Sequence, residues 1–283
     1  MSANPSDHLA PRVRPDRTAP LHVEAILIGR DLLRGQVDDR NTRTLADAIA
    51  ARGGLVHRVT VVDDGERAVA GALREALERN PHLVVTTGGL GPAADDRTVD
   101  AIAAALGRPI ENSPVARKIV EEAYRRLYSA RVIEREGLDR NREKLCRMPV
   151  GATPVANPIG TSPGVICRIP GGCSVLALPG KPQEMKAVLD GALPLLKDIA
   201  ARGHVAQREI ESPTADESSL RPLLDKLGEE YPQVRFSTRP VGFGRKGSKV
   251  LITLETVAAN KEDAQAAIEA GVGRLLAIVS GCS

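Results

Sequence analysis

The chain has 283 residues, a formal net charge of +3 at pH 7 and no tryptophan. No apolar run reaches the roughly 20 residues that a membrane-spanning helix needs, and the small net charge gives no global attraction to nucleic acid or an anionic membrane. The four cysteines have neither zinc-site nor CxxC spacing. These features predict a cytoplasmic protein with reduced thiols, and they exclude membrane and nucleic acid as expected partners.

Residues 1–20 contain scattered arginine and proline without an apolar core, so we interpret them as a disordered leader and not as a signal peptide. Strands are then predicted at Val23–Ile28, Leu55–Val62 and Leu83–Thr87, and helices at Asn41–Ala51, Glu66–Arg79 and from Thr98 onward. This alternation predicts a parallel sheet with helices on both faces.

The second half of the chain changes pattern twice. Ser113-Pro114 begins a further helix, and residues 131–148 look like a charged, exposed and partly helical excursion. A hairpin is predicted from Val165–Ile169 and Cys173–Leu178, followed by a helix that begins near Pro182. After residue 203 the order strand–helix–strand–strand–helix suits a small α+β domain. We therefore expect an α/β domain over residues 21–203 and an α+β domain over residues 204–283.

A glycine-rich loop follows the predicted central strand. Gly88, Gly89 and Gly91 precede the neighbouring carboxylates Asp95 and Asp96. A glycine-rich turn between a strand and a helix leaves backbone N–H groups free to hold phosphate, although such turns are often only tight turns. Asp96 has two readings from sequence, as a catalytic carboxylate or as a cap of the following helix.

Ligands of open α/β sheets bind outside the carboxyl ends of the strands. Four loops that combine glycines with carboxylate, amide or hydroxyl groups are predicted to leave such ends, namely residues 29–41, 87–98, 157–164 and 179–184. Their glycines would expose donors for phosphate. Asp39, Asp95 and Asp96 are candidates for holding a divalent metal or for orienting an attacking group.

The chain resembles the molybdopterin-binding domain family of molybdenum-cofactor biosynthesis, in the version found at the N-terminus of the competence/damage-inducible protein CinA. The resemblance covers most of residues 23–200. It rests on four ordered stretches: Gly29 through Asn41, Thr87 through Thr98 (Thr-Gly-Gly-Leu-Gly-Pro followed by Asp-Asp), Asn157 through Gly164, and Leu178 through Lys186. The segment after residue 205 also resembles the small domain that follows in such proteins.

The resemblance implies a Rossmann-like α/β/α sandwich that binds a phosphorylated pterin or an adenine nucleotide. It implies Asp39 and Asp96 as catalytic residues. From the chemistry of their carboxylates, Asp95 and Asp96 are the expected ligands of a divalent metal, Mg²⁺, Mn²⁺ or Co²⁺. The resemblance also implies a homo-oligomer, either a dimer or a trimer. The implied ligand-binding residues are Gly29, Asp31, Gly35, Asn41, Thr87, Gly88, Gly89, Gly91, Pro92, Asn157, Gly160, Thr161, Pro179, Gly180 and Glu184.

Two departures from the family pattern affect the expected chemistry. Arg30 stands where the family has an acidic or amide residue, and Asp31 replaces a glutamate. A cation in place of a carboxylate favours phosphate binding and weakens a nearby metal site.

Three functional hypotheses follow. The first is a metal-dependent pyrophosphatase acting on ADP-ribose-like molecules, and the second is a non-hydrolytic module that binds or adenylylates molybdopterin. A third, weaker one is nucleic-acid binding through the Gly244–Gly247 loop, which a solvated hairpin loop explains more simply.

Overall fold

The computed structural model describes residues 21–196, 203–214, 216–241 and 249–279. The predicted leader and the Gly244–Gly247 loop lie outside these residues. The chain divides into two compact units, the first holding β1 to β8 and the second holding β9 to β11. Among the described residues, no helix is both long and apolar enough to cross a membrane.

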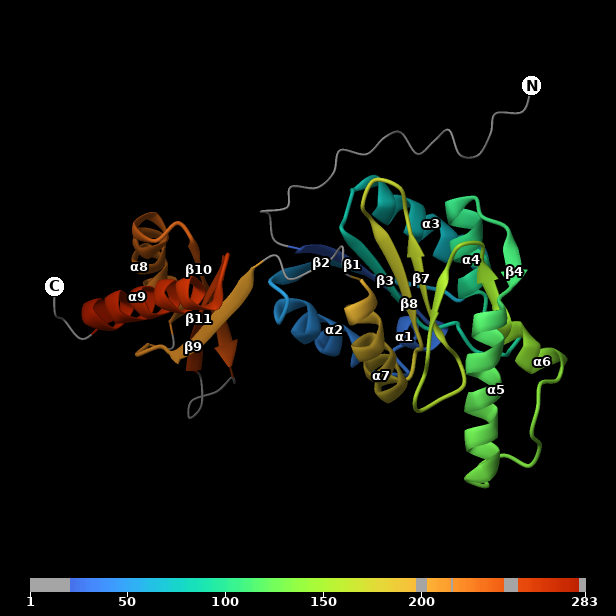
Figure 1. Ribbon diagram of the computed structural model, residues 1–283. Helices are drawn as coiled ribbons and strands as arrows, with labels where there is room; N and C mark the ends of the chain where they lie inside the picture. Colours follow the sequence, from blue (N-terminus) through green and yellow to red (C-terminus); the bar gives the residue numbers. More distant parts are fainter. Residues whose placement is uncertain (1–20, 197–202, 215, 242–248, 280–283) are drawn as a thin grey trace. The chain divides into compact units, whose positions relative to one another are not determined.

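A six-stranded sheet forms the centre of the first unit (Figure 1). Its strands are, in spatial order, β2 (Gly54–Val62), β1 (Leu21–Ile28), β3 (Leu83–Thr87), β8 (Ser174–Leu178), β7 (Gly164–Arg168) and β6 (Thr153–Val155). β3 pairs in parallel with both β1 and β8, whereas β7 runs antiparallel to β8 and to β6. β3 is buried along its whole length, as its apolar, β-branched sequence predicts for a central parallel strand.

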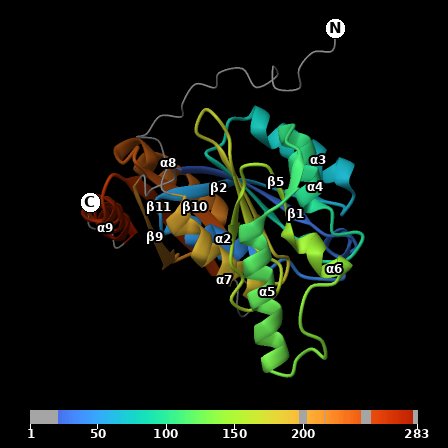
Figure 2. The same cartoon turned by 45° about the vertical axis from the view of Figure 1, so that its right-hand side comes forward.

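Helices cover both faces of this sheet (Figures 1 and 2). Val84 of β3 packs in one core with α3 (Glu66–Glu78) and α4 (Thr98–Leu106). Its neighbours Leu83 and Val85 point into a second core with α2 (Asn41–Ala50) and α7 (Pro182–Ala192). The alternation of side chains along one strand therefore divides the two cores, and the predicted α/β/α sandwich is confirmed.

The charged stretch between α4 and the hairpin packs as a small subassembly. It begins with β4 (Ile110–Asn112) and α5 (Pro114–Ser129), which is capped by the Ser113 hydroxyl accepting from the Ala116 N–H at 3.2 Å. After α5 come α6 (Arg140–Glu143), a 3-10 turn (Lys144–Cys146) and β5 (Arg147–Pro149), and β5 pairs antiparallel with β4. The remaining short helix of this unit, α1 (Arg30–Leu33), directly follows β1. Buried Leu145 and Cys146 pack with Tyr124 of α5. The segment from Arg140 to Arg147 is thereby anchored to α5.

The second unit is a three-stranded antiparallel sheet with two helices. Its elements are β9 (His204–Glu211), α8 (Glu217–Glu230), β10 (Val234–Val241), β11 (Lys249–Ala258) and α9 (Lys261–Val279), and the strand order is β10-β11-β9. Leu227 of α8 and Leu254 of β11 are fully buried in its core. This is the strand–helix–strand–strand–helix order that the sequence predicts.

Candidate functional site

One cavity of about 570 Å³ opens at the carboxyl ends of the parallel strands in the first unit; we call it the main cavity. Its size is within the range of small-molecule sites. It is lined by Ile28, Gly29, Asp64, Gly88, Gly89, Leu90, Gly91, Pro92, Ala93, Asp95, Asp96, Thr161, Ser162, Pro179, Gly180, Lys181 and Glu184. All four predicted loops therefore meet at one site, the first of them only through Gly29 at the end of β1.

The glycine loop is fixed between β3 and α4 by its own backbone and by Thr98. The Gly88 N–H donates to the Leu178 carbonyl at 3.0 Å, and the Thr98 hydroxyl donates to the Gly88 carbonyl at 2.8 Å. Gly89 has φ +65°, and a Cβ there would lie 2.2 Å from the Thr98 hydroxyl. Glycine is needed at this position because the backbone is left-handed and the side chain of Thr98 already fills the space.

Three successive N–H groups of this loop, those of Gly89, Leu90 and Gly91, have no hydrogen-bond partner among the described residues. All three residues line the main cavity. Unpaired N–H groups at a strand-to-helix turn are the donors that α/β proteins offer to phosphate. The loop thus presents the unpaired N–H groups that its glycine content predicts.

Asp95 and Asp96 both line the main cavity, but only one of their carboxylates has a hydrogen-bond partner in the described part of the chain. Asp96 Oδ2 accepts from the Ala93 N–H at 3.0 Å. Asp95 is exposed and makes no hydrogen bond or ion pair among the described residues. Asp96 therefore shapes the loop, and it does not cap α4, whose N-terminus has no side-chain cap. Asp95 keeps both oxygens available for a ligand.

A second wall of the cavity is organised by Asn157, which is 2% exposed. Its Nδ2 donates to Glu184 Oε2 at 2.8 Å and to the Ser162 carbonyl at 3.0 Å. Its Oδ1 accepts from the N–H groups of Ile159 and Gly160 at 3.1 and 2.8 Å. Asn157 itself does not line the cavity; it orients Glu184, which does.

The loop before α2 contributes mainly support. Asp39 Oδ1 accepts from the N–H groups of Asn41 and Thr42 at 2.9 and 3.0 Å, so it caps α2. Asn41 is buried and donates to the Gly180 carbonyl at 2.8 Å, which ties this helix to the Pro179–Glu184 loop. Neither Asp39 nor Asn41 lines the main cavity.

Arg30 does not line the cavity either, because it pairs with the chain after β2. Its guanidinium contacts Asp63 Oδ1 at 3.0 Å, and this hydrogen bond lowers the pKa of the Asp63 carboxyl below its ordinary value. The Arg30 N–H donates to Asp64 Oδ1 at 2.7 Å. Asp63 thus neutralises the charge of Arg30. Asp64, from the same loop after β2, adds a carboxylate to the lining of the main cavity.

The structure brings together eleven of the site residues predicted from sequence, nine from the ligand-binding set and two from the catalytic and metal-binding set, in the cavity lining: Gly29, Gly88, Gly89, Gly91, Pro92, Asp95, Asp96, Thr161, Pro179, Gly180 and Glu184. Outside the lining lie Asp31, Gly35, Asp39, Asn41, Thr87, Asn157 and Gly160. Sequence reasoning missed Asp64 and Lys181. Asp64 follows a predicted strand at the same edge of the sheet, so the strand-end rule could have found it.

The charged residues that line the main cavity are four carboxylates (Asp64, Asp95, Asp96 and Glu184) and one ammonium (Lys181), a formal charge of −3. Among the described residues there is no group of three or more His, Cys, Asp and Glu side chains that could hold a metal ion. Two carboxylates at one wall still suit a hard cation such as Mg²⁺, which takes one or two protein carboxylates and completes its shell with water and phosphate oxygens.

Comparison with known proteins identifies relatives of both sequence and fold. Residues 24–198 match the family described as probable molybdopterin binding domain. A protein of Pyrobaculum calidifontis is 32% identical over 256 residues, covering 90% of this chain and 94% of its own length. A protein of Aeropyrum pernix is 38% identical over 218 residues, covering 77% of this chain and 78% of its own. The crystal structure of the protein CinA with unknown function from Thermoplasma acidophilum is 33% identical, with a TM-score of 0.55, and the match covers 63% of this chain and 99% of that chain.

Proposed function

We propose that the main cavity is a phosphate-ester site. The premise is that this chain belongs to the family of probable molybdopterin binding domains and resembles its CinA type. The cavity binds a phosphorylated pterin or an adenine nucleotide and hydrolyses the diphosphate of an ADP-ribose-like molecule. A divalent cation, Mg²⁺, Mn²⁺ or Co²⁺, assists.

One observation carries this proposal: unpaired backbone donors and free carboxylate oxygens share one wall. The N–H groups of Gly89, Leu90 and Gly91 are without partners among the described residues, and they adjoin Asp95 and Asp96. The donors suit phosphate oxygens. The carboxylates give the cavity its negative charge, so a diphosphate enters only with a cation that offsets the repulsion.

The residues divide the work of a hydrolysis. The glycine loop holds the diphosphate, and Asp96, fixed by the Ala93 N–H, keeps that loop in place. Asp95 accepts the proton of a water molecule that attacks phosphorus. The bond to the bridging oxygen breaks, and AMP and ribose 5-phosphate are the products. A bound cation would hold phosphate oxygens and offset their charge, with Asp95 and Asp96 as its protein ligands.

The test is AMP release from ADP-ribose with each of the three metals, comparing the wild type with Asp96→Asn. We expect metal-dependent turnover in the wild type and a loss of about 100-fold or more in the variant. The matched control is Asp190→Asn, the same change at an exposed carboxylate of α7 that pairs with Lys186. No turnover by the wild type would contradict hydrolysis, and equal losses in both variants would contradict a specific role of Asp96 in it.

A non-hydrolytic module that binds or adenylylates molybdopterin is the second candidate. It is favoured by the lack, among the described side chains, of any three-group cluster for a metal. Binding of adenylates or pterin without AMP release, unaffected by EDTA, would support this candidate over the first.

A further inference from the structure

A second cavity, which we call the basic pocket, lies against the same glycine loop and has a volume of about 510 Å³. Its charged lining residues are Arg97, Arg140, Lys144, Arg147, Asp100 and Glu143. Four cations against two carboxylates leave a formal charge of +2. Apart from Arg97 and Asp100, these residues come from the segment 140–147 that packs against α5.

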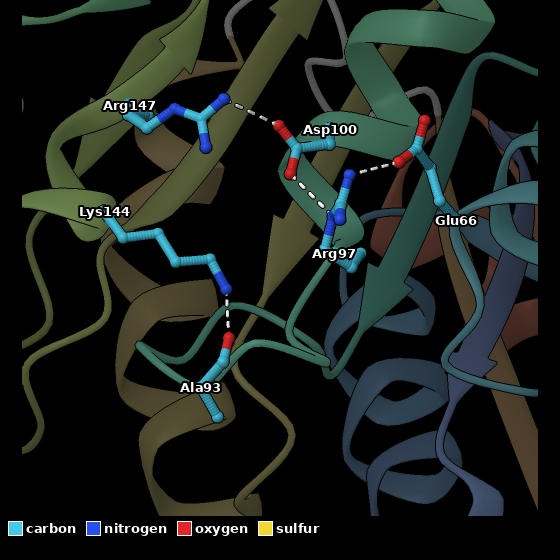
Figure 3. Close-up of polar contacts among 6 residues, drawn as sticks. All are labelled: Glu66, Ala93, Arg97, Asp100, Lys144 and Arg147. Atoms are coloured by element: carbon cyan, nitrogen blue, oxygen red, sulfur yellow. Dashed lines mark hydrogen bonds and ion pairs between the residues drawn. The ribbon is translucent and has the colours of Figure 1, made fainter. Parts of the chain in front are cut away.

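Part of this charge is already neutralised inside the protein (Figure 3). Arg97 donates to Asp100 at 2.9 Å and also pairs with Glu66 of α3. Arg147 donates to the other Asp100 oxygen at 3.1 Å. These two arginines are therefore balanced by two carboxylates, and their ion pairs form a floor of the pocket that links β5, α4 and α3.

The remaining two cations have no carboxylate of their own. The guanidinium of Arg140 has no hydrogen-bond or ion-pair partner among the described residues. Lys144 donates to the neutral carbonyl of Ala93 (Figure 3), and burial lowers its pKa while the charge of Asp96 partly offsets that effect. Glu143, the carboxylate between them in sequence, is held by Arg117 at 3.0 Å. Within the part of the chain that the structure describes, Arg140 and Lys144 therefore line this pocket without a carboxylate paired to either of them.

We propose that the basic pocket is a binding site for a phosphate group, which Arg140 and Lys144 hold without a metal ion. Guanidinium and ammonium groups are the side chains that bind phosphate most strongly, the first by its planar fork and the second as a point charge. The proposal stands on the pocket's own lining, so it holds whether or not the main cavity hydrolyses its ligand.

The position of Lys144 links this site to the glycine loop. The carbonyl of Ala93 accepts from Lys144, and the N–H of the same residue donates to Asp96 Oδ2. A phosphate that draws Lys144 away from this carbonyl would change the support of the loop that carries Asp96. The two cavities therefore share contacts to the backbone of one residue, Ala93.

The experiment is calorimetric titration of the full chain with inorganic pyrophosphate in EDTA at low ionic strength. We expect binding by the wild type, a weakening of about tenfold in Arg140→Glu and of about threefold in Lys144→Gln. Thermal unfolding confirms that each variant is folded. Arg221→Glu, a charge reversal at an exposed arginine of α8, controls for net charge and should leave binding unchanged.

Lys181→Glu separates this site from the main cavity, because Lys181 is the one ammonium that lines that cavity. Loss of metal-free binding in Lys181→Glu, with Arg140→Glu unaffected, would place the anion in the main cavity and overturn the proposal. Absence of binding by the wild type in EDTA would overturn it as well. Repeating the titration with AMP distinguishes a free inorganic anion from the phosphate end of a larger ester.

Discussion

The loop from Gly89 to Arg97 borders two cavities of similar volume and opposite charge. The main cavity, about 570 Å³, carries four carboxylates and one ammonium, whereas the basic pocket, about 510 Å³, carries four cations and two carboxylates. Size therefore does not distinguish them, but electrostatics does. On the two proposals, a phosphate would need a cation beside it in the first cavity and none in the second.

The two regions also differ in how they are built. The main cavity is made of loops at the carboxyl edge of the sheet, which the topology of any such sheet brings together. The basic pocket depends on a connecting segment outside the parallel sheet, the stretch from α6 to β5, which buried Leu145 and Cys146 hold against α5. General fold rules locate the first region, and only the packing of that segment reveals the second.

Gly91→Ala should give the largest difference between its effects on the two cavities. A Cβ at Gly91 would lie 2.4 Å from Asp96 Oδ2. This atom is the end of a movable side chain, so we expect Asp96 to shift at a cost in stability below about 1 kcal/mol. Displacing Asp96, the brace of the glycine loop and a proposed cation ligand, should lower the rate of AMP release by about 100-fold. Metal-free pyrophosphate binding at the basic pocket should change less than about twofold.

The control for Gly91→Ala is Gly228→Ala in α8, where a Cβ would meet nothing within 4 Å. There we expect unchanged activity and a gain in stability of about 0.5–1 kcal/mol, because alanine replaces glycine inside a helix. Parallel losses of AMP release and metal-free anion binding in Gly91→Ala would contradict the separation of the two cavities.

Asn157→Ala tests the wall of the main cavity that the glycine loop does not form. The side chain of Asn157 makes four hydrogen bonds and is 2% exposed. Its removal leaves buried partners unsatisfied, so we expect the free energy of unfolding to fall by about 2–3 kcal/mol in urea denaturation. Glu184 loses its donor, and ligand affinity at the main cavity should fall, with the basic pocket unaffected. A stability change below about 0.5 kcal/mol would show that water replaces these hydrogen bonds.

The sequence predicts much of this arrangement, for identifiable reasons. Strands such as β3 and helices such as α3 have long apolar patterns, and the glycine loop lies where a strand ends. By contrast, β4, β5 and β6 are three residues each, too short for a periodic signal. Asp39 shows a further limit: its role as a cap of α2 is fixed by hydrogen bonds to Asn41 and Thr42, whereas its motif position alone implied catalysis.

The basic pocket is harder to predict from sequence because two of its arginines are paired with carboxylates that are distant in the sequence. Arg97 and Glu66 are separated by 31 residues, and Arg147 and Asp100 by 47. Only the fold shows which arginines are paired and that Arg140 is not among them. The prediction that residues 131–148 are exposed and partly helical is confirmed for α6 but is wrong for Leu145, Cys146 and Met148, which are buried. The charge balance of the segment depends on tertiary contacts.

Asp100→Asn tests whether the floor of the basic pocket is held by its ion pairs. The side chain of Asp100 is 16% exposed and accepts from both Arg97 and Arg147. Removing its charge leaves two arginines that repel each other, so we expect a loss of about 1 kcal/mol in stability that shrinks as salt is added. Metal-free pyrophosphate binding should strengthen, because the pocket becomes more positive. Weaker binding would show that the geometry of the floor matters more than its charge.

Lys144→Met should give the smallest change in stability, visible in its pH dependence; pyrophosphate binding should weaken about threefold, as in Lys144→Gln. Burial lowers the pKa of Lys144 from its ordinary value of 10.5, against the attraction of Asp96, Asp100 and Asp95 and with a further lowering by Arg97. Below its folded-state pKa the ammonium is charged in both states, and its desolvation costs stability. Between that pKa and 10.5 the unfolded chain binds more protons, so the wild type gains stability as pH rises. Urea denaturation in EDTA should show this gain in the wild type and its absence in Lys144→Met; identical pH profiles would mean that Lys144 is solvated and that Arg140 alone supplies the pocket's unpaired charge.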